Sequence, residues 1–418
     1  MRLGTAKFSD MEYELEDFET KKAGTLIDRL YSVGLGGSVH SLIKIIDNVA
    51  YFCCADKYIY AVDCTNGSKL WAFKTNGIMA GNSPEIKDGI LYSGTLSGRL
   101  YVVDISTGKE LWWFRAGGGI TGKPLYYNDK LYFGCLDNMF YCIDAKTHLE
   151  VWRFRTGGGI LFSPGVYNNK IYFGSGDGYF YCADADTGME QWRIHTGDEI
   201  YSEAPCNFYN GNVYFSSVDN YLYCVNADTG MEQWKVKTGK FGNCFSPVIY
   251  NDVIYHGSRD GFLYAFNLSG RELWRFRPGG LVGVGVLIYK DRVYFGSEDG
   301  FTYCIDMTGR EQWRYRTFGQ VWCPPSLWNN KVIFGSWDCH VYCVDADTGF
   351  LQWSFPTNMQ TKSQIDPPYK AWEFEIKKDA PQDEEGGSDR YNVNINPNFV
   401  DGSEYSVKSE YVHESEYG

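Results

Sequence analysis

The chain has 418 residues, of which 17% are aromatic and 47 are glycine, a composition typical of short strands joined by tight turns. Its net charge of −13 would repel a phosphate backbone and no basic run offsets that charge, so we expect no nucleic-acid partner. Neither a secretory pattern nor an apolar stretch long enough to span a bilayer occurs, which predicts a cytoplasmic protein without membrane insertion.

Residues 1–33 form an acidic N-terminal segment. Hydrophobic residues from Met11 to Leu15 alternate in it with glutamates from Glu12 to Glu16. This alternation fits an added strand at the edge of a sheet, and it fits a short acidic helix equally well.

An internal repeat occupies residues 34–357. Eight tryptophans recur at intervals of 39 to 42 residues: Trp71, Trp112, Trp152, Trp192, Trp234, Trp274, Trp313 and Trp353. A tyrosine precedes each of them by about ten residues: Tyr60, Tyr101, Tyr141, Tyr181, Tyr223, Tyr264, Tyr303 and Tyr342. Two columns in one register establish eight copies of a single unit.

One copy, residues 157–196, shows the structure of the unit. Residues 163–167, 170–175, 179–184 and 189–195 read as strands, and turn residues such as Asn168-Asn169 and Asp177-Gly178 separate them. A sheet of four short strands cannot bury both of its faces alone, so the copies must stack into a closed ring. The sequence therefore predicts an all-β, eight-bladed β-propeller of four-stranded antiparallel blades, with extra terminal segments.

The turn before the tryptophan carries a family resemblance. The stretch Ala183–Trp192, ADADTGMEQW, resembles the tryptophan-docking repeat of the pyrroloquinoline quinone (PQQ)-type β-propellers. The resemblance covers residues 34–357 and implies the propeller fold. That family includes periplasmic quinoprotein dehydrogenases, an outer-membrane assembly lipoprotein and many cytoplasmic propellers, so the resemblance does not choose a function.

Quinoprotein chemistry is not expected. The adjacent Cys53 and Cys54 look like the vicinal disulfide of quinoprotein dehydrogenases, but their register places them at the end of a second strand rather than before it. Near the axis only Glu203 is acidic, and one carboxylate does not make a calcium cage. The six histidines lack metal-ligand spacing. We therefore expect no PQQ, no calcium, no other metal site and no catalytic residue.

One mouth of the central channel is the candidate binding site. Its mixed ring comprises polar and aromatic residues that lead into the first strands: His40, Asn82, Lys123, Glu203, Asn243, Tyr201 and Trp322, with Phe162 and Phe245 nearby. Polar groups beside aromatic rings suit a peptide or a small ligand. The same residues could instead simply fill and hydrate the channel.

Beyond the repeats the composition changes. Residues 358–378 could add a strand, because Trp372, Phe374 and Ile376 alternate with glutamates. Residues 379–418 have the composition of an acidic, flexible tail. The tail repeats Ser-Glu-Tyr at Tyr405, Tyr411 and Tyr417, a pattern that suits docking or modification and that chance drift could also produce.

Taken together, these patterns favour a non-enzymatic cytoplasmic scaffold that binds a protein or peptide partner. Two alternatives stay open: the tail is presented to a partner as a docking or modification substrate, or the channel mouth serves a ligand-binding or quinoprotein-like enzyme. The oligomeric state is not predicted.

Overall fold

A computed structural model describes residues 37–357, except for Ala80, Glu203, Lys240, Phe241, Asn243, Cys244 and Val284. The expected terminal features in residues 1–33, 358–378 and 379–418, including Tyr405, Tyr411 and Tyr417, lie outside the described residues.

The described residues form 32 strands. The first four blades comprise β1 (Lys44–Ile46), β2 (Val49–Cys54), β3 (Tyr58–Asp63) and β4 (Lys69–Lys74); β5 (Glu85–Lys87), β6 (Ile90–Gly94), β7 (Arg99–Asp104) and β8 (Lys109–Arg115); β9 (Leu125–Tyr127), β10 (Lys130–Gly134), β11 (Met139–Asp144) and β12 (Glu150–Arg155); and β13 (Gly165–Tyr167), β14 (Lys170–Gly174), β15 (Tyr179–Asp184) and β16 (Glu190–His195). Blades 5 to 8 comprise β17 (Asn207–Tyr209), β18 (Asn212–Ser216), β19 (Tyr221–Asn226) and β20 (Glu232–Lys237); β21 (Val248–Tyr250), β22 (Val253–Gly257), β23 (Leu263–Asn267) and β24 (Glu272–Phe276); β25 (Leu287–Tyr289), β26 (Arg292–Gly296), β27 (Phe301–Asp306) and β28 (Glu311–Arg316); and β29 (Ser326–Trp328), β30 (Lys331–Ser336), β31 (His340–Asp345) and β32 (Leu351–Pro356).

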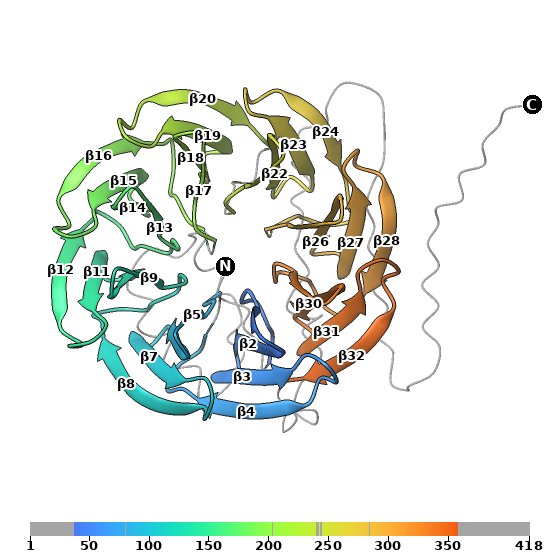
Figure 1. Ribbon diagram of the computed structural model, residues 1–418. Helices are drawn as coiled ribbons and strands as arrows, with labels where there is room; N and C mark the ends of the chain where they lie inside the picture. The colour runs from blue at the N-terminus through green and yellow to red at the C-terminus, as the bar shows by residue number, and fades with distance from the viewer. Residues whose placement is uncertain are drawn as a thin grey trace, which may run out of the picture. The chain divides into compact units, whose positions relative to one another are not determined.

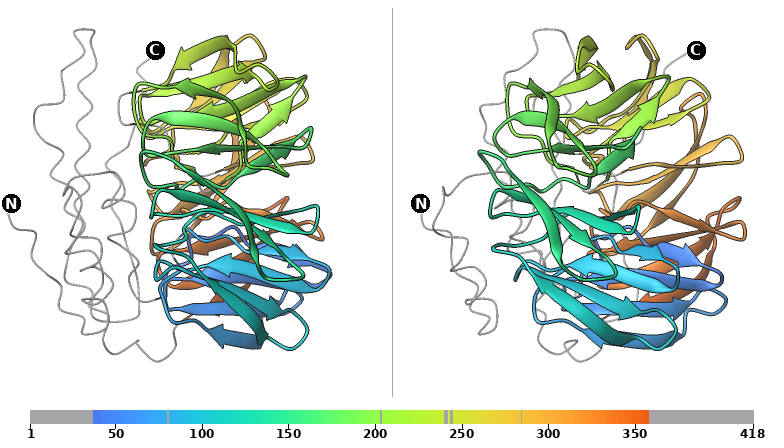
Figure 2. Two further views of the ribbon diagram at one scale, coloured as in Figure 1. Left: turned by 90° about the vertical axis from the view of Figure 1, so that its left-hand side faces the viewer. Right: turned by 60° about the vertical axis from the view of Figure 1, so that its left-hand side comes forward.

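Each blade is a four-stranded antiparallel sheet whose strands follow one another in chain order. The first strand of a blade lies nearest the axis and the fourth lies at the outer edge (Figure 1). Seen from the side, the strands run between the two faces of the ring (Figure 2). The prediction of an eight-bladed all-β propeller is confirmed, and in blade 4 the first strand begins at Gly165, two residues later than expected.

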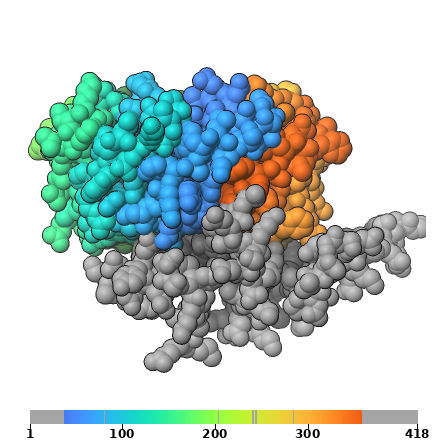
Figure 3. Space-filling model, turned by 90° about the horizontal axis from the view of Figure 1, so that it is seen from below, coloured from blue at the N-terminus to red at the C-terminus, as the bar shows by residue number. Residues whose placement is uncertain are grey.

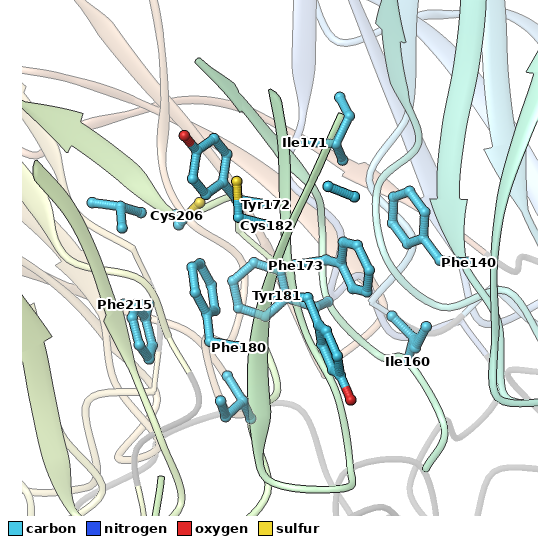
Figure 4. Close-up of a cluster of buried hydrophobic side chains, with 14 of the residues drawn as sticks. Phe140, Ile160, Ile171, Tyr172, Phe173, Phe180, Tyr181, Cys182, Cys206 and Phe215 are labelled. Atoms are coloured by element: carbon cyan, nitrogen blue, oxygen red, sulfur yellow. The ribbon is translucent and has the colours of Figure 1, made fainter. Parts of the chain in front are cut away.

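The core lies between the blades, because the second and third strands are buried on both faces. Phe140 of blade 3 stacks on Phe173 of blade 4 with ring centroids 4.1 Å apart, and Phe180 of blade 4 stacks on Phe215 of blade 5 at 3.8 Å (Figure 4). Burying an aromatic ring of this size contributes about 2–3 kcal/mol to the free energy of unfolding, so these stacked rings stabilise the contacts between neighbouring blades.

The repeated tryptophan joins each fourth strand to the next blade. Nε1 of Trp192 donates a hydrogen bond to the carbonyl oxygen of Ala227 at 3.0 Å, and Trp71, Trp152, Trp234, Trp274, Trp313 and Trp353 donate in the same way to Ile105, Ala185, Leu268, Met307, Ala346 and Cys64. The indole also covers a glycine of the next blade, such as Gly188 beneath Trp152. Blade 3 has His148 at this turn position, and its ring stacks on Trp112 at 4.0 Å.

Blades 1 and 8 close the ring without exchanging strands. Nε1 of Trp353 donates to the carbonyl oxygen of Cys64 at 2.7 Å, and the Ser326 hydroxyl donates to that of Ile43 at 2.6 Å. The Thr357 hydroxyl donates to the carbonyl oxygen of Gly37. The two end blades consequently lie side by side, as the adjacent blue and orange surfaces in Figure 3 show.

Candidate functional site at the channel mouth

The strand order divides the connections between two faces of the ring. Because the four strands of a blade alternate in direction, the links between blades and the turns between second and third strands lie on one face. We call this the loop face. The other two turns of each blade lie on the opposite face, which we call the turn face.

Four aromatic rings follow one another at the loop face. The His40 and Trp337 rings lie 4.9 Å apart, Trp337 stacks on Trp322 at 5.7 Å, and Trp322 meets Phe245 edge-on at 5.9 Å. We call these four residues the aromatic arc. It runs from blade 1 through blade 8 to the link that enters blade 6, so it spans segments that are distant in sequence.

A glycine in the link to blade 7 makes room for the arc. A Cβ at Gly283 would lie 3.1 Å from Cε2 of Phe245 and 3.5 Å from Cη2 of Trp322. The backbone beside this glycine is held from both sides. Val282 N–H donates to the Ser258 carbonyl oxygen at 3.4 Å, and Glu298 N–H donates to that of Leu281 at 3.0 Å.

One repeat position on the loop face differs between the two halves of the ring. It follows the small residue pair that ends each second strand, and its occupants from blade 1 to blade 8 are Ala55, Leu96, Leu136, Gly176, Val218, Arg259, Glu298 and Trp337. Five blades carry a small or apolar residue, whereas three consecutive blades carry a guanidinium, a carboxyl group and an indole. Such a local departure from a repeated pattern is expected at a functional site.

Arg259 and Glu298 are partly exposed residues, and some of their polar side-chain atoms are buried without favourable partners. Nε and Nη1 of Arg259 are buried and have no hydrogen-bond acceptor among the described residues. Burial raises the pKa of Glu298 to about 7, and the nearby charge of Arg259 opposes this rise. Within the described residues the two groups form no ion pair with each other, and Nε and Nη1 of Arg259 have no acceptor.

His40 is a neutral member of the arc near pH 7. Its side chain is 5% exposed, and burial lowers its pKa to about 4. Nε2 lies 2.8 Å from the Ser38 hydroxyl, which fixes the ring orientation. A neutral imidazole in this position acts as a flat packing surface for Trp337.

The other predicted site residues are engaged within the ring. Asn82 is fully buried and its Nδ2 donates to the Ile120 carbonyl oxygen. Lys123 pairs with Glu85, with 2.6 Å between Nζ and Oε2. Tyr201 and Phe162 are buried, whereas Glu203 and Asn243 lie outside the described residues.

The structure therefore brings together only part of the predicted ring: His40 and Trp322 join through Trp337, and Trp322 meets Phe245. Sequence reasoning missed Trp337, Arg259 and Glu298. Comparing the eight residues that follow the small pairs would have revealed them, because the last three differ in kind from the first five.

A separate shallow pocket lies on the loop face of blade 4. Asp177, His195, Asp198 and Glu199 line it together with three glycines. The carboxylate of Asp177 already has partners within the protein, because it accepts hydrogen bonds from the Tyr181 hydroxyl and from two backbone N–H groups. This pocket is thus a less favourable binding candidate than the arc.

Three overlapping stretches, 55–162, 141–275 and 259–375, match the family model described as outer membrane protein assembly factor BamB. Together they cover most of the chain. The protein belongs to this family of PQQ-type β-propeller repeats. A search of curated proteins found no match.

Solved structures with the same fold are distant in sequence. The computationally designed protein Ika8 is 19% identical over 74% of this chain and 98% of its own, with a TM-score of 0.64. BamB from Moraxella catarrhalis is 19% identical over 76% of this chain and 95% of its own, with a TM-score of 0.61. A europium-containing methanol dehydrogenase is 13% identical over 74% and 83%, with a TM-score of 0.59. At these identities the likeness establishes the fold alone.

The described residues of this PQQ-type propeller do not fit a quinone site with calcium. Cys53 and Cys54 are successive residues of β2 that pack into different clusters and bond to different partners, Ser93 and the Gly37 carbonyl oxygen. No group of three His, Cys, Asp or Glu side chains suited to a metal ion occurs in the described part of the chain. The absence of PQQ and calcium nevertheless stays a prediction. Within the same residues, no helix has the length and apolar character needed to cross a membrane.

Proposed function

We propose that this protein is a cytoplasmic, non-enzymatic scaffold that binds a peptide segment of a protein partner at the loop face of blades 6–8. The observation that carries the proposal is the break in the repeat at Arg259, Glu298 and Trp337 beside the aromatic arc. Structural needs alone explain small or apolar residues at this position, as the other five blades show. Three polar or aromatic replacements in neighbouring blades are best explained by a ligand.

Two further observations support the proposal. The family model that matches the chain is described as an outer membrane protein assembly factor, and we take this description as support for a protein partner. The described cysteines are all free thiols, which suits a reducing compartment. Aromatic residues and arginine are enriched among residues that dominate protein interfaces, and the site combines both.

Affinity capture from native cells with matched variants tests the proposal. Trp337→Ala should abolish capture of at least one partner that the wild-type protein retains. The control is Met189→Ala combined with Met231→Ala, because these side chains are 67% and 66% exposed on the turn face. The proposal is wrong if the Trp337 variant, shown to be folded by its melting temperature, captures the same proteins as the control.

A further inference from the structure

The guanidinium of Arg259 has buried N–H groups that lack a hydrogen-bond acceptor. Buried N–H donors are normally hydrogen-bonded, and a buried charge without a partner is costly. Nε and Nη1 of Arg259 are both buried without an acceptor. The seven equivalent positions carry no such group, so the repeat does not require an arginine here.

The neighbouring carboxyl group does not serve as that acceptor. The charge of Arg259 opposes the rise that burial causes in the pKa of Glu298, but the two side chains make no ion pair within the described residues, and Nε and Nη1 of Arg259 have no acceptor. Burial favours the protonated form of Glu298, since its pKa is raised to about 7. A protonated carboxyl group donates a hydrogen bond, so beside Arg259 it would complement a second carboxylate rather than repel it.

The aromatic arc packs against a backbone segment that hydrogen-bonds to the residue before Arg259. Arg259 follows Ser258, whose carbonyl oxygen accepts a hydrogen bond from Val282 N–H. The residue after Val282 is Gly283, which lies against Trp322 and Phe245. A ligand that bears both a carboxylate and a flat or apolar group could therefore contact the charge and the arc together. An extended peptide carries these two groups within one or two residues.

We propose that Arg259 binds a carboxylate of the partner peptide while the side chain beside that carboxylate packs on Trp337, a partly exposed member of the arc. This inference rests on the proposed function and names its recognition chemistry. A guanidinium presents two parallel N–H groups that match the two oxygens of a carboxylate. The carboxylate has two possible sources, the C-terminus of a peptide and an Asp or Glu side chain.

Three short peptides separate these sources when titrated against the full-length protein by calorimetry: N-acetyl-Gly-Phe, N-acetyl-Gly-Phe-amide and N-acetyl-Glu-Phe-amide. Binding of the first alone identifies a C-terminal carboxylate, and binding of the third identifies a side-chain carboxylate. The uncharged second peptide should bind at least tenfold more weakly than whichever charged peptide binds. Equal binding of the charged and uncharged peptides, or binding of none, would overturn the inference.

Variants test the role of the guanidinium itself. Arg259→Gln should weaken binding of the charged peptide at least tenfold, and Arg259→Lys should weaken it less, since it keeps the charge but loses the fork. Arg277→Gln is the matched control, because Arg277 is an exposed arginine of the same blade on the outer edge. Unchanged affinity in a folded Arg259→Gln protein would contradict the inference.

The same variants keep this inference distinct from the proposed function. If Trp337→Ala loses a cellular partner and Arg259→Gln retains it with full affinity, the loop face binds a partner but recognition of a carboxylate is wrong. If both variants retain every partner, both proposals are wrong.

Discussion

In seven of the eight blades a glycine lies four residues before the docking tryptophan, and the tryptophan of the preceding blade requires it. Gly188 has a φ of +70°, and a Cβ there would lie 2.6 Å from Cδ2 of Trp152. Two costs therefore meet at one residue: the left-handed backbone and the close approach of the indole. Blade 3 has His148 at this position. The backbone of His148 also has a positive φ, +64°, and its ring stacks on Trp112.

Replacing Gly188 with Ala should lower the free energy of unfolding by about 2–4 kcal/mol, because the methyl group adds overpacking to the backbone cost. Gly211→Ala is the control. Gly211 has a φ of +74° but no atom within 4 Å of a Cβ, so its substitution should cost only about 1 kcal/mol. Urea unfolding of both variants measures the difference, and equal losses would show that contact with the indole contributes nothing.

A second residue, His256, introduces a buried polar ring where most blades have phenylalanine. The equivalent residues are Phe52, Ser93, Phe133, Phe173, Phe215, Phe295 and Phe334. His256 is fully buried, and neither ring nitrogen has a hydrogen-bond partner. Burial lowers its pKa from 6.5 to about 3, so the ring stays neutral in the folded protein.

His256→Phe should raise the free energy of unfolding by about 1–3 kcal/mol at pH 7, because it removes unsatisfied polar atoms. Between pH 6.5 and about 3 the unfolded chain binds a proton that the folded protein excludes, so stability falls as the pH is lowered through this window. The variant should lose less stability between pH 7 and 5 than the wild type. The exposed His195→Gln serves as the control, and an equal loss in all three proteins would refute this explanation.

At the scale of the element, the tyrosine column is explained by a carboxylate in the neighbouring turn. The Tyr181 hydroxyl donates to Oδ2 of Asp177 at 2.8 Å. The same carboxylate accepts from Tyr179 N–H at 3.1 Å and from Gly157 N–H at 2.7 Å. One aspartate thereby fixes the turn, the third strand and the link from the preceding blade.

Asp177→Ala should destabilise the protein by about 2–4 kcal/mol, because three donors lose their acceptor, whereas Tyr181→Phe should cost about 1 kcal/mol. Blade 2 provides the comparison. There Ser97 occupies the aspartate position and the Tyr101 hydroxyl donates to Asn76 at 2.9 Å, so Ser97→Ala should cost about 1 kcal/mol. Thermal unfolding of the three variants gives the order, and an Asp177 variant as stable as the Ser97 variant would contradict it.

The strands could be predicted because each blade is specified locally. Turn residues such as Asp177-Gly178 and the tryptophan column lie within one copy, so counting residues was enough. The site could not be predicted in the same way. Arg259 and Trp337 are 78 residues apart and look like ordinary turn residues within their own copies. Their relation appears only when the register of the second strands places them on one face.

The predicted channel-mouth residues illustrate the same limit. Lys123 is predicted to line the channel mouth, and its ammonium group pairs with Glu85, a residue 38 positions earlier. Asn82 is buried beneath the Ile120 backbone. Position along a repeat predicts distance from the axis, but partners in the neighbouring blade decide whether a polar group remains available to a ligand.

At the scale of the whole molecule, one interface differs from the others. Blades 1 and 8 meet without a direct chain link through the described residues, and Trp353 is the docking tryptophan of this interface. It is 8% exposed, while the other docking tryptophans are partly buried. Non-covalent contacts alone must therefore keep the ring closed here.

Trp353→Ala should lower the free energy of unfolding by about 3–5 kcal/mol and should also expose the end blades. Trp192→Ala, the control, removes the same contact between blades 4 and 5, which the chain still links. Hydrogen exchange should accelerate in β1–β3 and β30–β32 for the Trp353 variant only. Equal exchange in both variants would show that this interface is no weaker than the others.

Every blade is built from one continuous stretch of chain. The contacts between blades therefore do not depend on which blade comes first in the sequence. Gly37 and Thr357 meet through a hydrogen bond at the junction of blades 1 and 8. A short peptide joining these positions, with new chain ends opened between any two other blades, should yield a circular permutant with the same ring. Each of the seven inter-blade links is a candidate position for the new chain ends, so the proposed partner site on blades 6–8 can be placed at the beginning, the middle or the end of the chain.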